Sequence, residues 1–332
     1  MRIVGIALAA VLGLAAVGRS EPVELKQVAA DAKWLVHVDV DAMRTSIVVQ
    51  KGYQKCMEMH KEAAQHLDKI HDMLGFDPRK DLHGVTAYGK DLDKHHGVLI
   101  VHADVDQKLL LEKAQKAPDH KVAKYGSYEI HSWTHKHGKD SHAAFGTFFQ
   151  PSVLVFAGSE EAIHAALDVL DGKAAGITDE KSPLAGHLAP GAILIVRASA
   201  VCPQTKCPIL KQTDAFRITL GENQGQSFYR ARLTMKSTEA VDQVKAVIEG
   251  FRAMVGLARG SDAETMKLVN ALKVTTKDNT VRLAWSAPAD EVWTAIEKAG
   301  KEIREKMAKR HGPAAGDAHK APTCPAKSDK AK

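Results

Sequence analysis

Residues 34–41 read WLVHVDVD, and residues 101–106 read VHADVD. Counted from Val36 and from Val101, the two segments are identical at five of six positions. In each segment apolar and polar side chains alternate, which is typical of a strand with one buried face. Each segment ends in an aspartate, Asp41 or Asp106, at the start of a helical stretch that this residue can cap. We therefore expect two similar junctions at which a strand passes into a helix.

The apolar periodicity around these junctions predicts the order strand, helix, strand, strand, helix, strand within residues 34–157. This is the split βαβ, or ferredoxin-like, order, and further antiparallel strands follow it. More hairpins and helices are expected after residue 190. The sequence thus predicts an α+β fold with two lobes of mostly antiparallel sheet and packed helices. The first lobe, with ferredoxin-like order, covers residues 21–175, and the second covers residues 176–308.

In the split βαβ order the first and third strands are parallel neighbours, so equivalent residues of the two segments would lie side by side. Because side chains alternate across a strand, the polar residues share one face. This predicts a polar square of His37, Asp39, His102 and Asp104. Two imidazoles and two carboxylates can bind a divalent transition metal such as zinc. The alternative, which is commoner in proteins, is that each carboxylate holds a histidine in a hydrogen-bonded pair that stabilises the sheet.

Histidines form a second cluster in the sequence. The chain has 17 of them, and His131, His135, His137 and His142 fall within twelve residues. Neutral imidazole binds zinc, copper and nickel, which makes this segment a second candidate metal site; the alternative is a solvated hairpin without a metal. If the fifteen histidines of residues 21–308 titrate near their reference pKa of about 6.5, this part of the chain gains positive charge on acidification.

The chain ends predict export. Residues 1–20 resemble a secretory signal peptide, with Arg2 before the apolar run Ile3–Val17 and small residues after it. That run is shorter than the ~20 residues that cross a bilayer, so no transmembrane segment is expected after cleavage. Export to the periplasm or the extracellular space permits disulfides, and Cys202 and Cys207 are close enough in sequence to form one. Residues 309–332 are rich in Ala, Lys and Pro and predict a disordered basic tail.

Composition excludes several classes of protein. The 332 residues are 45% hydrophobic and 26% charged, which is ordinary for a globular protein. The net charge of +6 comes from the two ends, since residues 21–308 hold 38 basic and 38 acidic side chains. A neutral body has no field to hold a nucleic-acid backbone. The sequence also lacks the Gly-x-Ser-x-Gly, His-Glu-x-x-His and Gly-rich phosphate-binding motifs of common enzymes.

Three segments resemble a family of uncharacterised exported bacterial α+β proteins. They are residues 36–43, residues 75–85 (GFDPRKDLHGV) and residues 125–133 (YGSYEIHSW). The resemblance spans most of residues 30–300, and it implies a secreted α+β body without an assigned activity, substrate or partner.

Together these features predict an exported, non-catalytic binding or envelope-associated protein with no cofactor. The alternative is a periplasmic protein that binds zinc, copper or nickel through the polar square or the His131–His142 segment.

Overall fold

The computed structural model describes residues 23–93, 95–137, 140–178, 182–199, 207–260 and 262–311. The expected signal peptide and residues 312–332 of the expected tail lie outside the described residues. Residues 309–311, also expected in the tail, instead form the end of helix α10 (Ala289–His311). Among the described residues, no helix combines the length and the apolar character that a membrane span requires.

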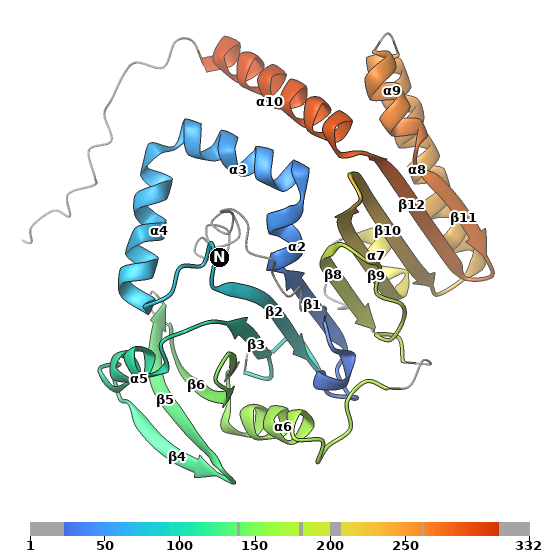
Figure 1. The fold of residues 1–332 in the computed structure, drawn as a ribbon. Coiled ribbons are helices and arrows are strands. Elements are labelled where there is room, and N and C mark those ends of the chain that lie inside the picture. The colour runs from blue at the N-terminus through green and yellow to red at the C-terminus, as the bar shows by residue number, and fades with distance from the viewer. Residues whose placement is uncertain are drawn as a thin grey trace, which may run out of the picture. The chain divides into compact units, whose positions relative to one another are not determined.

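The described strands form one twelve-stranded antiparallel sheet in the order β11-β12-β10-β9-β8-β1-β2-β3-β7-β6-β5-β4 (Figure 1). The strands are β1 (Trp34–Asp39), β2 (Leu82–Gly89), β3 (Val98–Ala103), β4 (Lys121–Tyr125), β5 (Tyr128–His137), β6 (Asp140–Gln150), β7 (Val153–Ala157), β8 (Ala192–Ser199), β9 (Thr213–Asn223), β10 (Gln226–Met235), β11 (Lys273–Lys277) and β12 (Thr280–Pro288).

Helices occupy the connections between these strands. They are η1 (Leu25–Gln27), α2 (Val40–Thr45), α3 (Ile47–Met59), α4 (Lys61–Leu74), α5 (Gln107–Gln115), α6 (Glu160–Leu170), α7 (Pro208–Lys211), α8 (Thr238–Arg259), α9 (Ala263–Asn270) and α10. The mixture of helices and antiparallel sheet confirms the α+β class.

Capping side chains account for where several helices begin. Asp106 accepts a hydrogen bond from the Leu109 amide and caps α5, as predicted. The cap of α2 is Asp39, which accepts from the Ala42 amide at 2.8 Å, so the expectation that Asp41 caps this helix was wrong. Asp41 lies inside the first turn of α2 instead, because the helix begins one residue before it.

The ferredoxin-like order was also wrong. β2 pairs antiparallel with both β1 and β3, and therefore separates the two strands that were expected to be neighbours. Helices α2, α3 and α4 form an arch that returns the chain to the same end of the sheet, where Asp39 lies opposite Gly84 (Figure 1). The split βαβ order would have required this connection to cross to the opposite end of the sheet, so that β2 ran parallel to β1 with β3 between them.

The two expected lobes share one sheet. β1 and β8, from the two sides of the expected boundary at residue 175, pair antiparallel in its middle. The break between compact units falls between Trp293 and Thr294, within α10. The division near residue 175 is therefore corrected: it does not interrupt the sheet, because β8 adds directly to the free edge of β1.

The chain repeats one topology about the β1–β8 pair. Read outward from that pair, the strands are β1-β2-β3-β7-β6 on one side and β8-β9-β10-β12-β11 on the other. Along the chain each side supplies a single strand, a connection that contains at least one helix, a hairpin, one or two helices, a second hairpin and a final helix. β4 and β5 extend only the first side.

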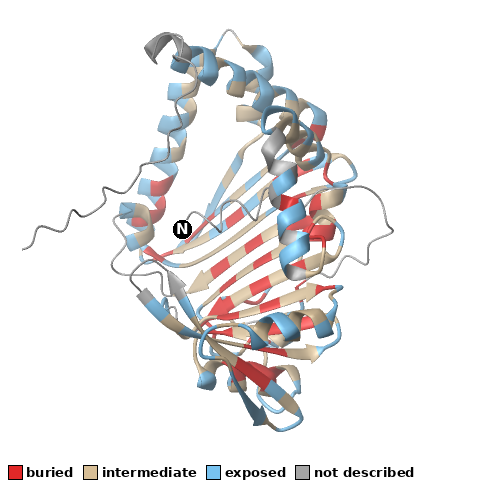
Figure 2. Cartoon of the chain, turned by 90° about the vertical axis from the view of Figure 1, so that its left-hand side faces the viewer, coloured by how far each residue is buried: buried red, intermediate tan, exposed pale blue. Residues whose placement is uncertain are grey.

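The central strands bury their two faces to different extents. One face carries the main core, in which Leu35, Ile100 and Val155 are fully buried against Ile163 and Leu167 of α6. Along the strands, buried residues alternate with residues of intermediate exposure (Figure 2). We call the opposite side of β1, β2, β3, β7 and β8 the half-buried face; its apolar residues are Trp34, Val36, Val38, Val85, Ala87, Leu99, Val101, Phe156, Leu194 and Val196.

Candidate functional site

The predicted polar square does not form as a set of four neighbours. β2 lies between its two halves: His37 is opposite Thr86, while Asp39 and His102 are both opposite Gly84. Asp104 lies beyond the end of β3 and contacts another residue, His83. Among the described residues no group of three or more His, Cys, Asp or Glu side chains could hold a metal ion.

His37 is a core residue. It is 2% exposed, and its Nδ1 lies 2.9 Å from the Thr86 hydroxyl. Burial, reinforced by the nearby His102, lowers the pKa of His37 to about 4. His37 is therefore a neutral imidazole at neutral pH. This geometry agrees with the alternative to a metal site, in which the histidine forms a hydrogen-bonded pair within the sheet. The partner of His37 is a hydroxyl, whereas a carboxylate was expected.

The histidine-rich segment forms two strands, as the hairpin interpretation required. His135 lies directly opposite His142 across β5 and β6, and His137 lies opposite Asp140. The His142 ring meets the His95 ring edge-on, with centroids 5.4 Å apart.

His131 belongs to a different pair. Its Nδ1 lies 3.0 Å from Nε2 of His120, and the two rings are stacked. Burial, together with the neighbouring His120, lowers the pKa of His131. The four histidines expected in one metal site are therefore divided between two places in the sheet. Fewer than fifteen histidines gain charge near their reference pKa, because His37 and His131 titrate lower.

Cys202 lies outside the described residues, so its disulfide with Cys207 stays a prediction. Cys56, in α3, is a partly buried free thiol.

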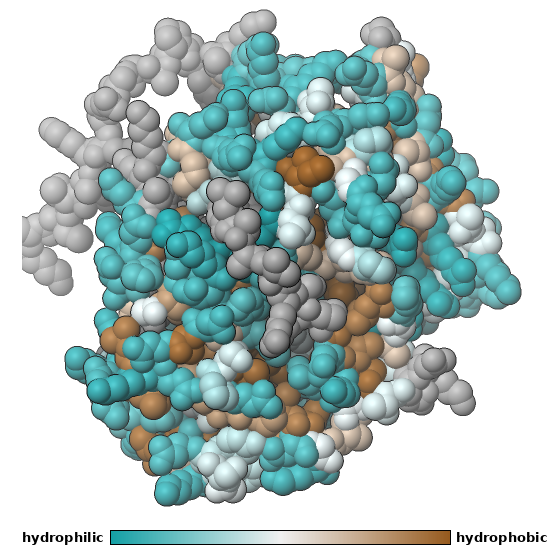
Figure 3. All heavy atoms as spheres, in the orientation of Figure 1, coloured by the Kyte–Doolittle hydropathy of each residue, from teal (hydrophilic) through white to brown (hydrophobic). Residues whose placement is uncertain are grey.

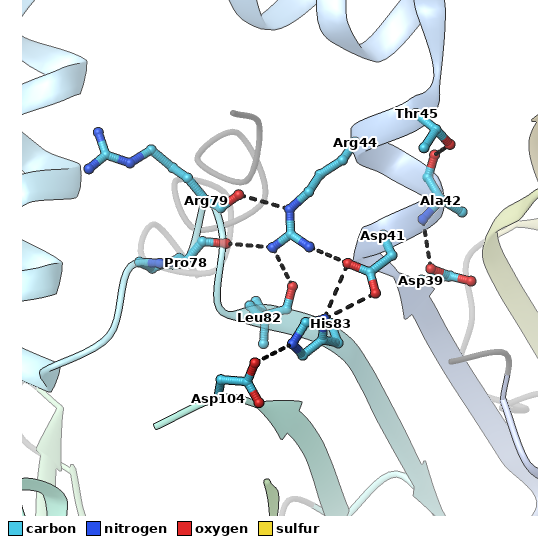
Figure 4. A network of polar contacts seen from close by, with 10 residues as sticks. All are labelled: Asp39, Asp41, Ala42, Arg44, Thr45, Pro78, Arg79, Leu82, His83 and Asp104. Carbon is cyan, nitrogen blue, oxygen red and sulfur yellow. Dashed lines mark hydrogen bonds and ion pairs between the residues drawn. The ribbon is translucent and has the colours of Figure 1, made fainter. Parts of the chain in front are cut away.

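A polar network that the sequence did not reveal ties α2 to the ends of β2 and β3 (Figure 4). At its centre, Nδ1 of His83 lies 3.0 Å from Oδ2 of Asp41, and Nε2 of His83 lies 3.2 Å from Oδ2 of Asp104. Asp41 is 5% exposed, whereas the Asp104 side chain is largely in solvent. Figure 4 shows the His83 ring between the two carboxylates.

Arg44 completes the network on the side of α2. Its guanidinium donates to Oδ1 of Asp41, and its Nε donates to the carbonyl oxygen of Arg79 at 2.8 Å. It also donates to the carbonyl oxygens of Pro78 and Leu82, the latter at 2.5 Å. The largely buried guanidinium of Arg44 thus joins the beginning of the α2–α4 arch to the segment that leads from its end into β2.

The sequence carried only weak signals for this network. Arg44 follows Asp41 by three residues, a spacing that brings side chains together on a helix. His83 lies in one of the segments that carried the family resemblance, but forty-two residues separate it from Asp41. Only the return of the arch to the same end of the sheet brings these residues into contact.

The network makes the stability of the protein depend on pH. Burial lowers the pKa of His83, but hydrogen bonds to Asp104 and Asp41 outweigh this and raise it above the ordinary value. A raised folded-state pKa contributes stability that is complete below the unfolded pKa of about 6.5 and is lost as pH rises through the folded value.

We therefore expect His83→Gln to destabilise the protein by about 1–2 kcal/mol near pH 6, and by less near pH 8.5. Urea unfolding of both proteins at the two pH values measures the difference. If the difference in unfolding free energy between wild type and His83→Gln grows with rising pH, the hydrogen bonds do not raise the pKa of His83 as proposed. His135→Gln, on an exposed strand position, is the control and is expected to follow the wild type.

An apolar cleft opens at the other end of the half-buried face. It encloses about 350 Å³ and is lined by Trp34, Ala87, Leu92, Asp93, Gly97, Val98, Leu99, Ala144, Phe145, Phe156 and Ala157. Trp34 is fixed at its edge, since its indole Nε1 donates to the carbonyl oxygen of Asp91 at 2.5 Å. Phe156 packs edge-on against Trp133. The space-filling view shows hydrophobic residues gathered over the strands in the middle of the sheet (Figure 3).

No family model and no curated protein matches this chain. Among solved structures, crystal forms I and III of TP0453 are similar to it with a TM-score of 0.43 and 11% and 12% sequence identity. The matches cover 85% and 84% of this chain and 99% and 98% of those chains. Crystal form IV of TP0453 has a TM-score of 0.40 at 10% identity and covers 84% of this chain and 98% of its own. At these values the likenesses assign no function.

Proposed function

We propose that this is an exported, non-catalytic binding protein that holds a small apolar molecule against the half-buried face of its sheet. The observation that carries the proposal is the cleft at Trp34, Leu99 and Phe156, which continues into rows of incompletely buried apolar side chains. Export is supported by the signal-like sequence of residues 1–20.

The rows of the half-buried face are continuous across neighbouring strands. Val36 of β1 lies between Val196 of β8 and Ala87 of β2, and the same row continues through Leu99 of β3 and Phe156 of β7. Each of these residues keeps intermediate exposure. Apolar surface left in contact with water costs about 25 cal/mol per Å². Contiguous apolar patches on soluble proteins are therefore commonly binding surfaces.

The lining of the cleft indicates the chemistry of its ligand. Its size falls in the range of small-molecule sites. Aromatic rings of Trp34, Phe145 and Phe156 form its walls, and the carboxylate of Asp93 is the one ionisable side chain among its described lining residues. This lining favours an uncharged, compact apolar molecule, and it offers no nucleophile paired with a base for catalysis.

The test uses the uncharged fluorophore N-phenyl-1-naphthylamine as the probe. We expect saturable binding to the wild type, and about tenfold weaker binding to Ala144→Phe, because the added ring occupies the cleft. Leu92→Asp places a charge at the mouth, where Leu92 is 68% exposed, and is expected to weaken binding with little effect on folding.

Val122→Asp is the matched control for that charge, since Val122 on β4 is also exposed and does not line the cleft. Thermal unfolding verifies that each variant is folded. If folded Ala144→Phe and Leu92→Asp bind the probe as tightly as Val122→Asp does, the proposal is wrong. Absence of saturable binding to the wild type leads to the same conclusion.

A further inference from the structure

We propose a second binding site on the core side of the β2–β3 hairpin, a pocket beside α6 in which the buried Tyr88 hydroxyl donates a hydrogen bond to the carbonyl group of a small, uncharged, mainly apolar molecule. This inference is independent of the ligand proposed above, because the two sites have separate linings that share only Val98 among the described residues.

The pocket is bounded by residues 29–32, which precede β1, by the ends of β2 and β3, and by the first turns of α6. It encloses about 320 Å³ and is more enclosed than the apolar cleft. Its lining residues are Ala29, Asp31, Ala32, Tyr88, Gly89, Lys90, His96, Val98, Ser159, Glu161, Ala162, Ala165 and Ala166. The alanines that precede β1 and those of α6 have small side chains, which leave the space open.

Tyr88 supplies the observation that points to a ligand. The residue is 3% exposed, and its hydroxyl oxygen is buried without a hydrogen-bond partner among the described residues. A buried hydroxyl without a partner destabilises a protein. Tyr88 also lines the pocket, so a bound molecule can supply the missing partner.

The surrounding charges select the kind of partner. Burial, together with the carboxylate of Asp31, raises the pKa of Tyr88, so the phenol stays protonated and can donate. Among the described lining residues Lys90 is the one lysine, and two carboxylates, Asp31 and Glu161, line the pocket as well.

His96 adds no free cation, because its Nδ1 lies 2.7 Å from Oδ2 of Asp91. With no excess of positive charge, the pocket favours a neutral carbonyl over a carboxylate. The alanines that line the pocket favour an apolar body of limited size.

Three probes of nearly equal size separate the contributions of the apolar ring, the neutral carbonyl group and the negative charge to binding. Benzamide has a ring and a neutral carbonyl, toluene has the ring alone, and benzoate has the ring and a charge. We expect benzamide to bind most tightly, with a millimolar dissociation constant, as measured by chemical-shift changes of the α6 alanine methyl groups. Toluene binding as tightly as benzamide would overturn the role of the hydroxyl. Tighter binding of benzoate would overturn the preference for a neutral ligand.

Tyr88→Phe tests the hydroxyl directly. Because the hydroxyl has no hydrogen-bond partner in the described part of the chain, this variant is expected to melt at the same temperature as the wild type or higher. Its affinity for benzamide is expected to fall by about fivefold to tenfold, while its affinity for toluene stays the same. Unchanged benzamide affinity in this variant would contradict the proposal.

Two further variants give the controls. Tyr128→Phe removes a tyrosine hydroxyl that donates to Asp171 outside the pocket, and it should leave benzamide binding unchanged. Ala144→Phe fills the apolar cleft and should also leave benzamide binding unchanged, which separates failure of this site from failure of the function proposed above. Loss of benzamide binding in either variant would place the probe elsewhere.

Discussion

Arg44→Ala is expected to lower the free energy of unfolding by about 3–5 kcal/mol, because it removes one partner of a buried charged pair. The Arg44 side chain is 12% exposed and that of Asp41 is 5% exposed. Without the guanidinium, the Asp41 carboxylate stays buried, and among the described residues His83 is the ionisable side chain that remains beside it. The carbonyl oxygens of Pro78 and Leu82 also lose a donor. Urea or thermal unfolding monitored by circular dichroism measures the effect.

Arg44→Lys is expected to recover only part of this loss. A lysine ammonium cannot reproduce the planar set of donors that reaches one carboxylate and several carbonyl oxygens at once. The control is Lys173→Ala, which removes an exposed ion pair of 2.7 Å with Asp171 and should cost no more than about 1 kcal/mol. Equal effects of Arg44→Ala and Lys173→Ala would show that the network does not hold the arch to the sheet.

His37 is expected to make the protein sensitive to acid. Its folded-state pKa of about 4 lies below the ordinary histidine value of about 6.5, so the unfolded chain binds a proton more readily than the folded chain. Stability is therefore lost as pH falls below about 6.5, and the loss from this residue reaches about 3 kcal/mol near pH 4. Unfolding free energies measured across this interval reveal the slope.

The double variant His37→Leu/Thr86→Val is expected to remove that slope. It replaces both members of the buried hydrogen bond by apolar groups of similar size, which leaves neither partner unsatisfied. Stability near pH 7 should then change by no more than about 1–2 kcal/mol. If the variant loses stability between pH 6.5 and 4 as steeply as the wild type does, the acid sensitivity originates elsewhere in the protein.

The candidate sites show where inference from the sequence stopped. Alternation along β1 correctly placed His37 and Asp39 together on one face, because it depends only on strand geometry. To place His102 and Asp104 beside them, the sequence also had to identify the strand that pairs with β1. That strand is β2, whereas β3 was expected. The similarity between residues 36–41 and 101–106 led to the expectation of two equivalent neighbouring strands, which the topology does not show. The structural counterpart of β1 is β8, whose sequence AILIVRAS shares little with it.

The sequence by itself determined the α+β class, the cap of α5 at Asp106 and the neutral charge balance of residues 21–308. These depend on composition and on contacts between residues a few positions apart. Tertiary structure alone decided that Asp41, His83 and Asp104 meet and that the half-buried face forms a cleft. It also decided that the Tyr88 hydroxyl is buried without a hydrogen-bond partner among the residues that the structure describes. These contacts depend on the end of the sheet to which each long connection returns. That choice is set by packing across the whole sheet, and it cannot be read from the sequence of any short segment.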